Sequence, residues 1–286
     1  MNNKLSFSKV SCAPNPHRIW WCATGPLAFL PIHAAEIYGK NKPGFNISDY
    51  VVSYTPTLAA IIGACESHGA HDKYQGLLAI SQPSTPGQSK LPNTEVELDI
   101  IKEQATKFGV RLLRGLEASM ENVIEGMEAH SWVHFTCHGM QDTIKPLKSA
   151  FCLHDKHLEL STIIVKSFPH ANLAFLSACQ TATGDEKLPE EAVHLAAGLM
   201  LAGYGSIIAT TWSIKDEDAP VIVGHMHVYT ELFGGTEPDS SGSVVALHHA
   251  VKLLHQQVGD DKFLSSVPFI HVGVWMLRLL ETLWMA

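Results

Sequence analysis

The chain has 286 residues, of which 46% are hydrophobic and 17% are charged, so it has enough apolar side chains for a substantial core. This composition argues against an intrinsically disordered protein, which would carry more charge and fewer apolar residues. The formal net charge of −8 does not suggest a basic surface for nucleic acid, and nothing in the composition favours that class of partner.

The first half of the chain predicts short strands and helices that alternate after an irregular lead-in over residues 1–18. The alternation follows from apolar runs and helical periodicity, with strands expected at 19–23, 51–54, 76–81 and 110–113 and helices at 57–66, 94–108 and 119–129. Thr94 and Glu97 have the spacing of a capping box at the start of their helix. Residues 82–92 are rich in Pro, Ser and Gly and predict a surface loop.

Two apolar runs in the middle of the chain predict buried parallel strands, and each leads to a residue that can do chemistry. The first reads Ser131-Trp-Val-His-Phe-Thr-Cys-His138-Gly139. The second reads Asn172-Leu-Ala-Phe-Leu-Ser-Ala-Cys179. If these strands are neighbours in one sheet, their carboxyl ends meet at the edge where open α/β sheets place their sites.

The rest of the chain continues the alternation. A strand at 150–153 and a helical turn after residue 160 are expected between the two reactive runs, followed by helices at 190–202, 219–233 and 243–258 and strands at 206–212 and 269–272. The fold class is therefore α/β, a three-layer sandwich with a mostly parallel sheet and helices on both faces. We expect a single domain over residues 19–273 and an amphipathic C-terminal tail over 274–286.

His138 and Cys179 have the residue types of a nucleophilic dyad. An imidazole beside a thiol can accept its proton, and the resulting thiolate can attack a carbonyl carbon. The backbone N–H groups of Gly139 and Cys179 could then stabilise the oxyanion of the tetrahedral intermediate. No side chain clearly orients the imidazole, and a backbone carbonyl could take that role.

A structural interpretation of the same residues remains open. A cysteine at the end of an apolar run is usually a buried core residue, and 17 histidines make one nearby histidine unremarkable. His134 and Cys137 compete with His138 for the site. His134, Thr136 and His138 share one face of the strand, and only His138 precedes a glycine at its end. Cys137 points the other way and is expected to be buried.

These motifs resemble the CHAT domain, a family of caspase-like and separase-like cysteine peptidases with many fungal members. The resemblance is carried by "HFTCHG" and by "LAFLSACQTATGDEKLPEEAVHLAAGLMLAGYGSIIATTWSIKDEDAP", and extends to "WWCATGPLAFLPIHAA", "LLAISQPSTPGQSKLP" and "VPFIHVG". It covers residues 18–273 and implies a caspase-like fold. By the same resemblance His138 is the general base, Cys179 the nucleophile and Gly139 an oxyanion-hole residue.

The resemblance also bears on specificity. The segment "TTWSIKDEDAP" is similar to the separase-like strand whose following acidic residues help form the pocket for the residue before the cut. Asp216 is the nearest match and Asp218 the next, and a carboxylate there would favour a basic side chain. The same acids also suit a helix N-terminus. In metacaspases an acid two residues before the nucleophile binds basic substrates, whereas this chain has Ser177.

Expectations for partners follow from the same analysis. We expect a cysteine endopeptidase that acts on protein substrates in regulated proteolysis or cell-death signalling, with a regulatory repeat module or sensor protein elsewhere. A catalytically silent scaffold and a redox sensor that pairs Cys179 with Cys137 are the alternatives. No cofactor is expected, and no metal, because no ligand set accompanies the histidines at 248, 249 and 255.

The expected compartment is the cytoplasm. The six cysteines are scattered without the regular spacing of a disulfide framework, which fits a reducing environment. The first twenty residues lack the apolar core of a signal peptide. No stretch reaches the roughly 18 apolar residues that a membrane span requires.

Overall fold

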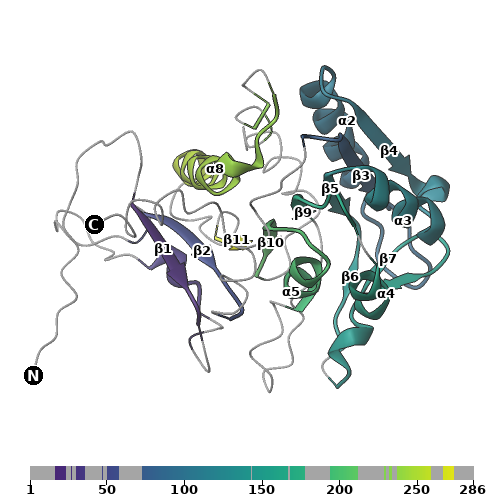
Figure 1. Ribbon diagram of the computed structural model, residues 1–286, viewed down its shortest axis with the longest axis horizontal. Coiled ribbons are helices and arrows are strands. Elements are labelled where there is room, and N and C mark those ends of the chain that lie inside the picture. Colours follow the sequence, from purple (N-terminus) through teal and green to yellow (C-terminus); the bar gives the residue numbers. More distant parts are fainter. Residues whose placement is uncertain are drawn as a thin grey trace, which may run out of the picture.

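The computed structural model describes residues 17–23, 27, 30–35, 47, 50–57, 73–142, 144–166, 168–177, 194–211, 229, 232–233, 237–258 and 267–273. In this part of the chain an eight-stranded sheet runs through the molecule in the order β1-β2-β11-β10-β9-β5-β3-β4 (Figure 1). The strands are β1 (Arg18–Trp21), β2 (Val51–Tyr54), β3 (Leu77–Ser81), β4 (Val110–Arg114), β5 (Trp132–Thr136), β9 (Leu173–Ser177), β10 (Ser206–Thr210) and β11 (Phe269–Gly273).

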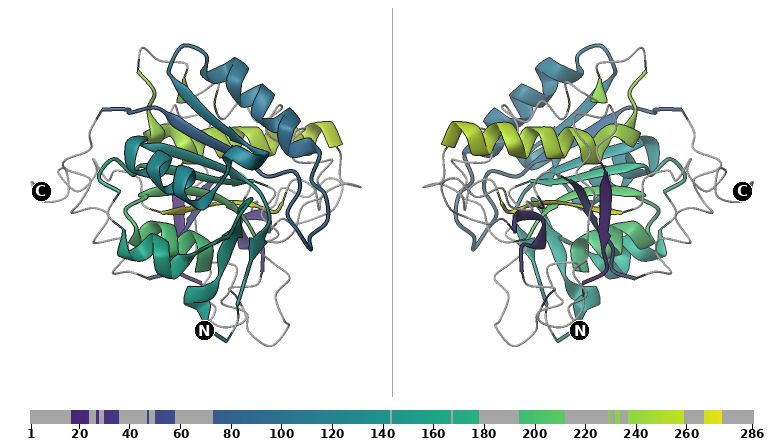
Figure 2. Two further views of the ribbon diagram at one scale, coloured as in Figure 1. Left: turned by 90° about the vertical axis from the view of Figure 1, so that its right-hand side faces the viewer. Right: turned by 90° about the vertical axis from the view of Figure 1, so that its left-hand side faces the viewer.

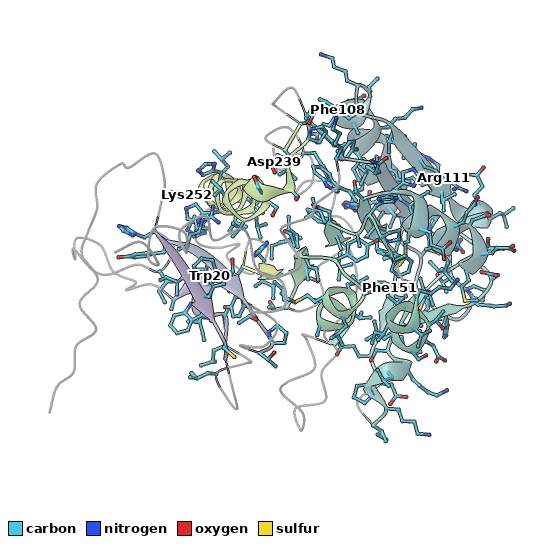
Figure 3. The ribbon with its side chains drawn as sticks, in the orientation of Figure 1. Trp20, Phe108, Arg111, Phe151, Asp239 and Lys252 are labelled. Atoms are coloured by element: carbon cyan, nitrogen blue, oxygen red, sulfur yellow. The ribbon has the colours of Figure 1, made fainter. Side chains whose placement is uncertain are left out.

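The sheet is mostly parallel, as predicted. Six of its seven neighbouring strand pairs are parallel, and β10 with β11 is the antiparallel pair. Strands β3, β4, β5, β9 and β10 therefore point one way, and β1, β2 and β11 point the other. Figure 3 shows Trp20 on the β1 edge and Arg111 on the β4 edge of this sheet. The carboxyl ends of the five co-directional strands form one edge, and the sequence places the reactive runs there.

Helices cover both faces of the sheet, which confirms the three-layer prediction (Figure 2). One face packs against α3 (Met120–Ala129), α4 (Leu160–Val165) and α5 (His194–Leu201). The other packs against α2 (Asn93–Ala105) and α8 (Ser243–Val258). The period-two pattern of β5 explains this division, because Val133 and Phe135 enter the first core and Trp132 the second.

A small second sheet follows directly after His138. It consists of β6 (Gly139–Met140), β7 (Ala150–Cys152) and β8 (His157–Glu159), which pair antiparallel, and the 3-10 helix η6 (Pro146–Lys148) lies between β6 and β7. The sequence predicted β7 and the helical turn that became α4. Strands of two and three residues are too short to show a period, and so β6 and β8 were missed.

The capping box predicted at Thr94 and Glu97 is wrong. Thr94 lies inside the first turn of α2, where its hydroxyl donates to the Leu91 carbonyl at 2.8 Å and accepts from Ser81 at 2.9 Å. Glu97 is fully buried and faces His134 on the sheet. The carboxylate pairs with a buried imidazole, and this interaction takes the place of the backbone contact that a capping box would provide.

Several predicted elements cannot be compared with the structure. The lead-in before residue 17, the tail over 274–286 and most of the helices predicted at 57–66 and 219–233 lie outside the described residues. The helix predicted at 243–258 matches α8 in full. Every helix in the described part of the chain is too short or too polar to cross a membrane.

A buried histidine connects the reversed strands to the rest of the sheet. His271 of β11 contacts the Ser53 hydroxyl on β2 through Nδ1 and the Ser206 hydroxyl on β10 through Nε2, each at 2.9 Å. Ser206 in turn contacts the hydroxyl of Ser243 on α8 at 2.7 Å. Burial lowers the pKa of His271 to about 3, and the charge of Arg18 adds to this effect, so the ring is neutral near neutral pH.

Candidate active site

The two strands that lead to the reactive residues are direct neighbours. β5 and β9 pair in parallel along their full length, and their last residues, Thr136 and Ser177, are register partners. His138 follows Thr136 by two residues, and Cys179 follows Ser177 by two residues. The shared edge expected from the sequence is therefore present. Cys179 itself lies outside the described residues.

The His138 ring is held in one orientation by a backbone carbonyl. Its side chain is buried, and Nε2 lies 2.8 Å from the carbonyl oxygen of Ser89. A carbonyl oxygen can only accept, so Nε2 carries the hydrogen and donates it. In the neutral ring Nδ1 then holds the lone pair, and this buried nitrogen has no hydrogen-bond partner among the described residues. His138 is thus prepared to accept a proton at Nδ1.

The loop that carries Ser89 is anchored at its start and closed on itself. The Gln82 N–H donates to the Thr136 carbonyl at 3.1 Å, directly before the His138 turn. The Leu91 N–H donates to the Pro83 carbonyl at 2.9 Å, which brings the two ends of the loop together. The predicted surface loop over 82–92 is exposed at residues 84, 86–90 and 92, whereas Gln82, Thr85 and Leu91 are buried.

Backbone contacts also fix the chain on the far side of His138. The Cys152 N–H of β7 donates to the His138 carbonyl at 2.8 Å, and Gly139 pairs with Phe151. Gly139 thus starts β6 next to the imidazole, at the position that the sequence assigns to an oxyanion donor. The structure places this glycine beside the histidine, and its role in catalysis remains a prediction.

Uncharged hydroxyl groups end three neighbouring strands of the sheet, and the one on β5 is two residues before His138. Ser81, Thr136 and Ser177 are register partners on β3, β5 and β9, and so they share one face of the sheet. The hydroxyl oxygens of Thr136 and Ser177 are buried and have no hydrogen-bond partner among the described residues. Ser177, which the sequence assigned to substrate binding, therefore offers a neutral donor and acceptor beneath the site.

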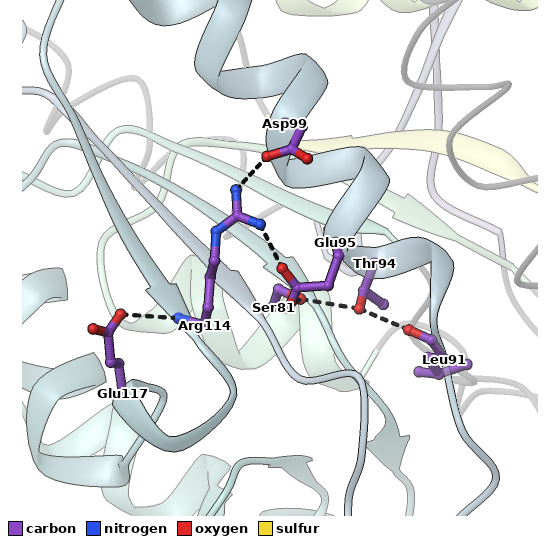
Figure 4. Close-up of polar contacts among 7 residues, drawn as sticks. All are labelled: Ser81, Leu91, Thr94, Glu95, Asp99, Arg114 and Glu117. Carbon is purple, nitrogen blue, oxygen red and sulfur yellow. Dashed lines mark hydrogen bonds and ion pairs between the residues drawn. The ribbon is translucent and has the colours of Figure 1, made fainter.

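Charged groups at the same edge of the sheet form a cluster of one arginine and two carboxylates (Figure 4). Arg114, the last residue of β4, pairs with Glu95 and, at 2.6 Å, with Asp99 on α2. Glu95 also accepts from the Ser81 hydroxyl at 3.1 Å. Partial burial opposes the positive charge, but the hydrogen bonds and charges of Asp99 and Glu95 outweigh it and raise the pKa of Arg114. This cluster connects the end of β4 to the first two turns of α2.

His134, the competing histidine, belongs to a buried network. Its Nε2 lies 2.7 Å from a Glu97 carboxylate oxygen and its Nδ1 lies 2.7 Å from the Tyr229 hydroxyl. The ring stacks on Phe175 with centroids 4.6 Å apart. Burial raises the pKa of Tyr229 well above its usual value, and the charge of Glu97 adds to this, so the phenol stays neutral. The structural interpretation of His134 is therefore correct.

The sequence did not reveal Ser89, Glu97 or Tyr229 as contacts of the two histidines. Ser89 contacts the ring through its main-chain carbonyl, which every residue type has. Glu97 was assigned to a helix cap. Cys137 is fully buried in the core on the opposite face, as expected. Asp216 and Asp218 lie outside the described residues, and their assignment to substrate binding stays a prediction. In the described part of the chain no group of three His, Cys, Asp or Glu side chains could hold a metal.

Comparison with known proteins places this geometry in a family. Two crystal structures of the Saccharomyces cerevisiae separase–securin complex match with TM-scores of 0.59 and 0.58 at 11% and 13% sequence identity, each over 87% of this chain and 15% of the matched chain. The Arg-specific cysteine proteinase gingipain R matches with a TM-score of 0.53 at 15% identity, over 83% of this chain and 56% of that one. At these identities the likeness concerns the fold, which is caspase-like.

The chain spans only part of these solved proteins, so their whole activities do not transfer to it. No curated protein matched the sequence. The model of the CHAT domain, however, matches residues 8–267. With a mostly parallel caspase-like sheet and the His-Gly motif at the edge of that sheet, the chain belongs to the CHAT domain family.

Proposed function

We propose that the protein is a cysteine endopeptidase in which His138 is the general base and Cys179 the nucleophile. One observation carries this proposal: the Ser89 carbonyl fixes Nε2 of His138 as the donor and leaves buried Nδ1 as a base without a hydrogen-bond partner among the described residues. This nitrogen lies at the end of β5, and the adjacent strand β9 leads to Cys179 two residues after it ends. A structural histidine would normally satisfy both ring nitrogens, as His134 does.

The geometry supports a conventional acyl-enzyme route. Neighbouring strands lie about 4.8 Å apart, so we expect His138 and Cys179, each two residues after its strand, to come within reach of one another. Nδ1 of His138 would take the thiol proton, and the sulfur of Cys179 would form a bond to the substrate carbonyl carbon. The imidazolium would then protonate the leaving amine as the C–N bond breaks, and water would hydrolyse the thioester. The Gly139 and Cys179 N–H groups are the proposed oxyanion donors.

The proposed substrate carries a basic residue before the scissile bond. Asp216 and Asp218 would supply the carboxylates for this residue, because Ser177 provides only a neutral hydroxyl. Gingipain R, a structural neighbour, is described as Arg-specific, and such a preference suits an acidic pocket. Ser177 would contact the same side chain from beneath through its hydroxyl, which has no partner among the described residues.

The proposed biological role is regulated proteolysis of protein substrates in the cytoplasm, including cell-death signalling. The separase neighbour was crystallised in complex with securin, and we extend this to a protein partner that regulates the present chain. A regulatory repeat module or a sensor protein would deliver the activating signal.

The experiment that tests the proposal measures alkylation of each cysteine by iodoacetamide, using peptide mass mapping. Cys22 is exposed and serves as the reference thiol, whereas Cys137 and Cys152 are fully buried and should react slowest. We expect Cys179 to react at least about tenfold faster than Cys22, because only a few per cent of an ordinary thiol is thiolate at pH 7. In His138→Ala this advantage should disappear.

His17→Ala is the matched control, because His17 is exposed directly before β1, and four strands of the sheet separate β1 from β5. This variant should leave the alkylation rate of Cys179 unchanged. Equal rates at Cys179 and Cys22 in the wild-type chain would contradict the dyad and favour a catalytically silent scaffold.

A further inference from the structure

An exposed turn beside the site combines apolar and basic side chains in an unusual way. Between β6 and β7, Ile144 is 85% exposed and Leu147 is 58% exposed. Lys145 and Lys148 alternate with them and are also exposed. We call residues 144–148 the hairpin tip (Figure 1). Two large aliphatic side chains in water within four residues are unfavourable unless another surface covers them.

The conformation of the hairpin tip is fixed by hydrogen bonds to its backbone N–H groups and to the residues that flank it. The carboxylate of Asp142 accepts from the Ile144 N–H at 3.0 Å and the Lys145 N–H at 2.8 Å. The Lys148 N–H donates to the Lys145 carbonyl at 2.7 Å, which forms the turn of η6. The Ser149 hydroxyl accepts from the Asp142 N–H at 3.1 Å and closes the base. Apolar side chains on a preorganised turn lose little conformational freedom when they bind.

The tip lies close to the proposed catalytic residues along the chain. Gly139 follows His138 and starts β6, and Ile144 lies five positions after it. A chain extends at most about 3.5 Å per residue, so the tip lies within about 18 Å of Gly139. An extended substrate would need five or six residues to reach from the proposed oxyanion donor Gly139 to the tip.

The charge of the tip identifies the chemistry of its partner. The Asp142 carboxylate is engaged by backbone N–H groups, whereas Lys145 and Lys148 extend from the turn. Lys148 approaches Glu159 only to 3.8 Å, and both side chains are well exposed, so this ion pair is weak. Residues 144–148 contain two lysines and no acid, and Asp142 and Glu159 flank them, on a chain whose net charge is −8.

We propose that the hairpin tip is an exosite, a contact point outside the catalytic centre, for an acidic and apolar segment of the protein substrate. Asp or Glu residues of this segment would pair with Lys145 and Lys148, and Leu- or Ile-like side chains would cover Ile144 and Leu147. The proposal rests on the proposed peptidase function. A second copy of this chain fits less well, because two copies with a charge of −8 repel each other.

Binding is measured first, without catalysis. Fluorescence anisotropy with the full chain carrying Cys179→Ala uses a labelled twelve-residue peptide of Asp, Glu, Leu and Ile, and a second peptide with Lys in place of the acids. We expect the acidic peptide to bind at least tenfold tighter than the basic one. Lys145→Glu with Lys148→Glu should weaken the acidic peptide at least tenfold, and so should Ile144→Ser with Leu147→Ser.

The control is Lys156→Glu with Val165→Ser, which changes one exposed lysine and one side chain that is 83% exposed, both outside the tip. This variant should bind the acidic peptide like the parent chain. Equal weakening in the control and the tip variants would overturn the exosite, and so would equal affinity for the acidic and basic peptides.

Cleavage separates the exosite from the catalytic proposal. With the active chain, tip variants should cleave a four-residue fluorogenic peptide at the wild-type rate. They should cleave a substrate extended by the acidic segment with a KM raised at least about fivefold and an unchanged kcat. Specific binding of the acidic peptide by a chain that cleaves nothing would refute the peptidase and retain the docking site. An unchanged KM for the extended substrate would refute the exosite alone.

Discussion

A main-chain atom, and no side chain, sets the tautomer of His138. The Ser89 carbonyl is neutral, so it orients the ring without adding the negative charge that a carboxylate orienter would place beside an imidazolium. His134, four residues earlier, has such a carboxylate in Glu97, yet its other nitrogen is occupied by Tyr229. At the scale of single residues, a nitrogen without a hydrogen-bond partner among the described residues therefore distinguishes the proposed base from the structural histidine.

The residue-level prediction concerns the pocket for a basic side chain. Asp216→Asn should reduce kcat/KM for peptides cleaved after Arg or Lys by about 10- to 100-fold, because a hydrogen bond to a charged group contributes about 1.5–3 kcal/mol. A profile over a peptide library measures this change. Glu217→Gln is the matched control, since it removes a neighbouring charge that would serve a helix N-terminus equally well. An unchanged profile in Asp216→Asn would remove that residue from the pocket.

The sequence predicted that His138 follows the end of a strand, because the following glycine and the alternation of β5 are visible in the chain, and its role as the base stays a prediction. It could not identify Ser89, since every residue offers the same carbonyl and only the course of the loop decides which one meets the ring. The roles of Cys179 and Asp216 depend on spacing and on family likeness, and they stay predictions.

At the scale of elements, the loop over 82–92 is part of the site. It connects β3 to α2, and its hydrogen bond from Gln82 to Thr136 ties it to the strand that carries His138. The sequence predicted the loop from its Pro and Gly content but gave no reason to connect it with catalysis. The capping box was wrongly predicted for a similar reason. Glu97 contacts His134, which is 37 residues away in the chain, and a local pattern cannot show such a contact.

Gly87 tests this connection. Its φ of +79° is strained for other residues, and an added Cβ would meet no atom within 4 Å, so Gly87→Ala should cost about 1–2 kcal/mol through backbone strain alone. Because the strain lies two residues from Ser89, we expect alkylation of Cys179 to slow several-fold. Gly109→Ala is the matched control, with a φ of +76° and equally open surroundings in the turn before β4. It should lower the free energy of unfolding similarly without slowing alkylation.

Equal rates of alkylation in the two glycine variants would show that the loop does not position His138. Urea unfolding of both variants checks that the two substitutions are comparable in stability.

At the scale of the whole molecule, the sheet changes direction between β10 and β11. The sequence predicted both strands and a mostly parallel sheet. It did not reveal the reversal, because a buried apolar run looks the same in either direction. His271 joins the two parts, since its ring links β2 and β11 to β10, and through Ser206 to α8. Residues 53, 206, 243 and 271 are far apart in the chain, so this network forms only when the whole sheet is assembled.

The network predicts how stability depends on pH. The folded pKa of His271 is lowered to about 3, so below the ordinary value of about 6.5 the unfolded chain binds a proton that the folded chain excludes. Stability from this group is complete above pH 6.5 and is lost as the pH falls toward 3, by on the order of 5 kcal/mol. Urea unfolding as a function of pH measures it.

His271→Gln should flatten this part of the pH profile, whatever its effect on stability at pH 7. His157→Gln, at an exposed site, should reproduce the wild-type slope. A profile for His271→Gln parallel to that of the wild type would show that the ring is protonated in the fold.

The contact between Ser89 and His138 has a consequence for how this protein can vary. Any amino acid at position 89 would supply an equivalent oxygen, so natural variants can exchange that side chain without losing the contact. Insertions or deletions between the end of β3 and the start of α2 would instead move a different peptide unit above the ring. Among relatives, the length of this connection should therefore distinguish catalytically active members from inactive ones better than the identity of its residues.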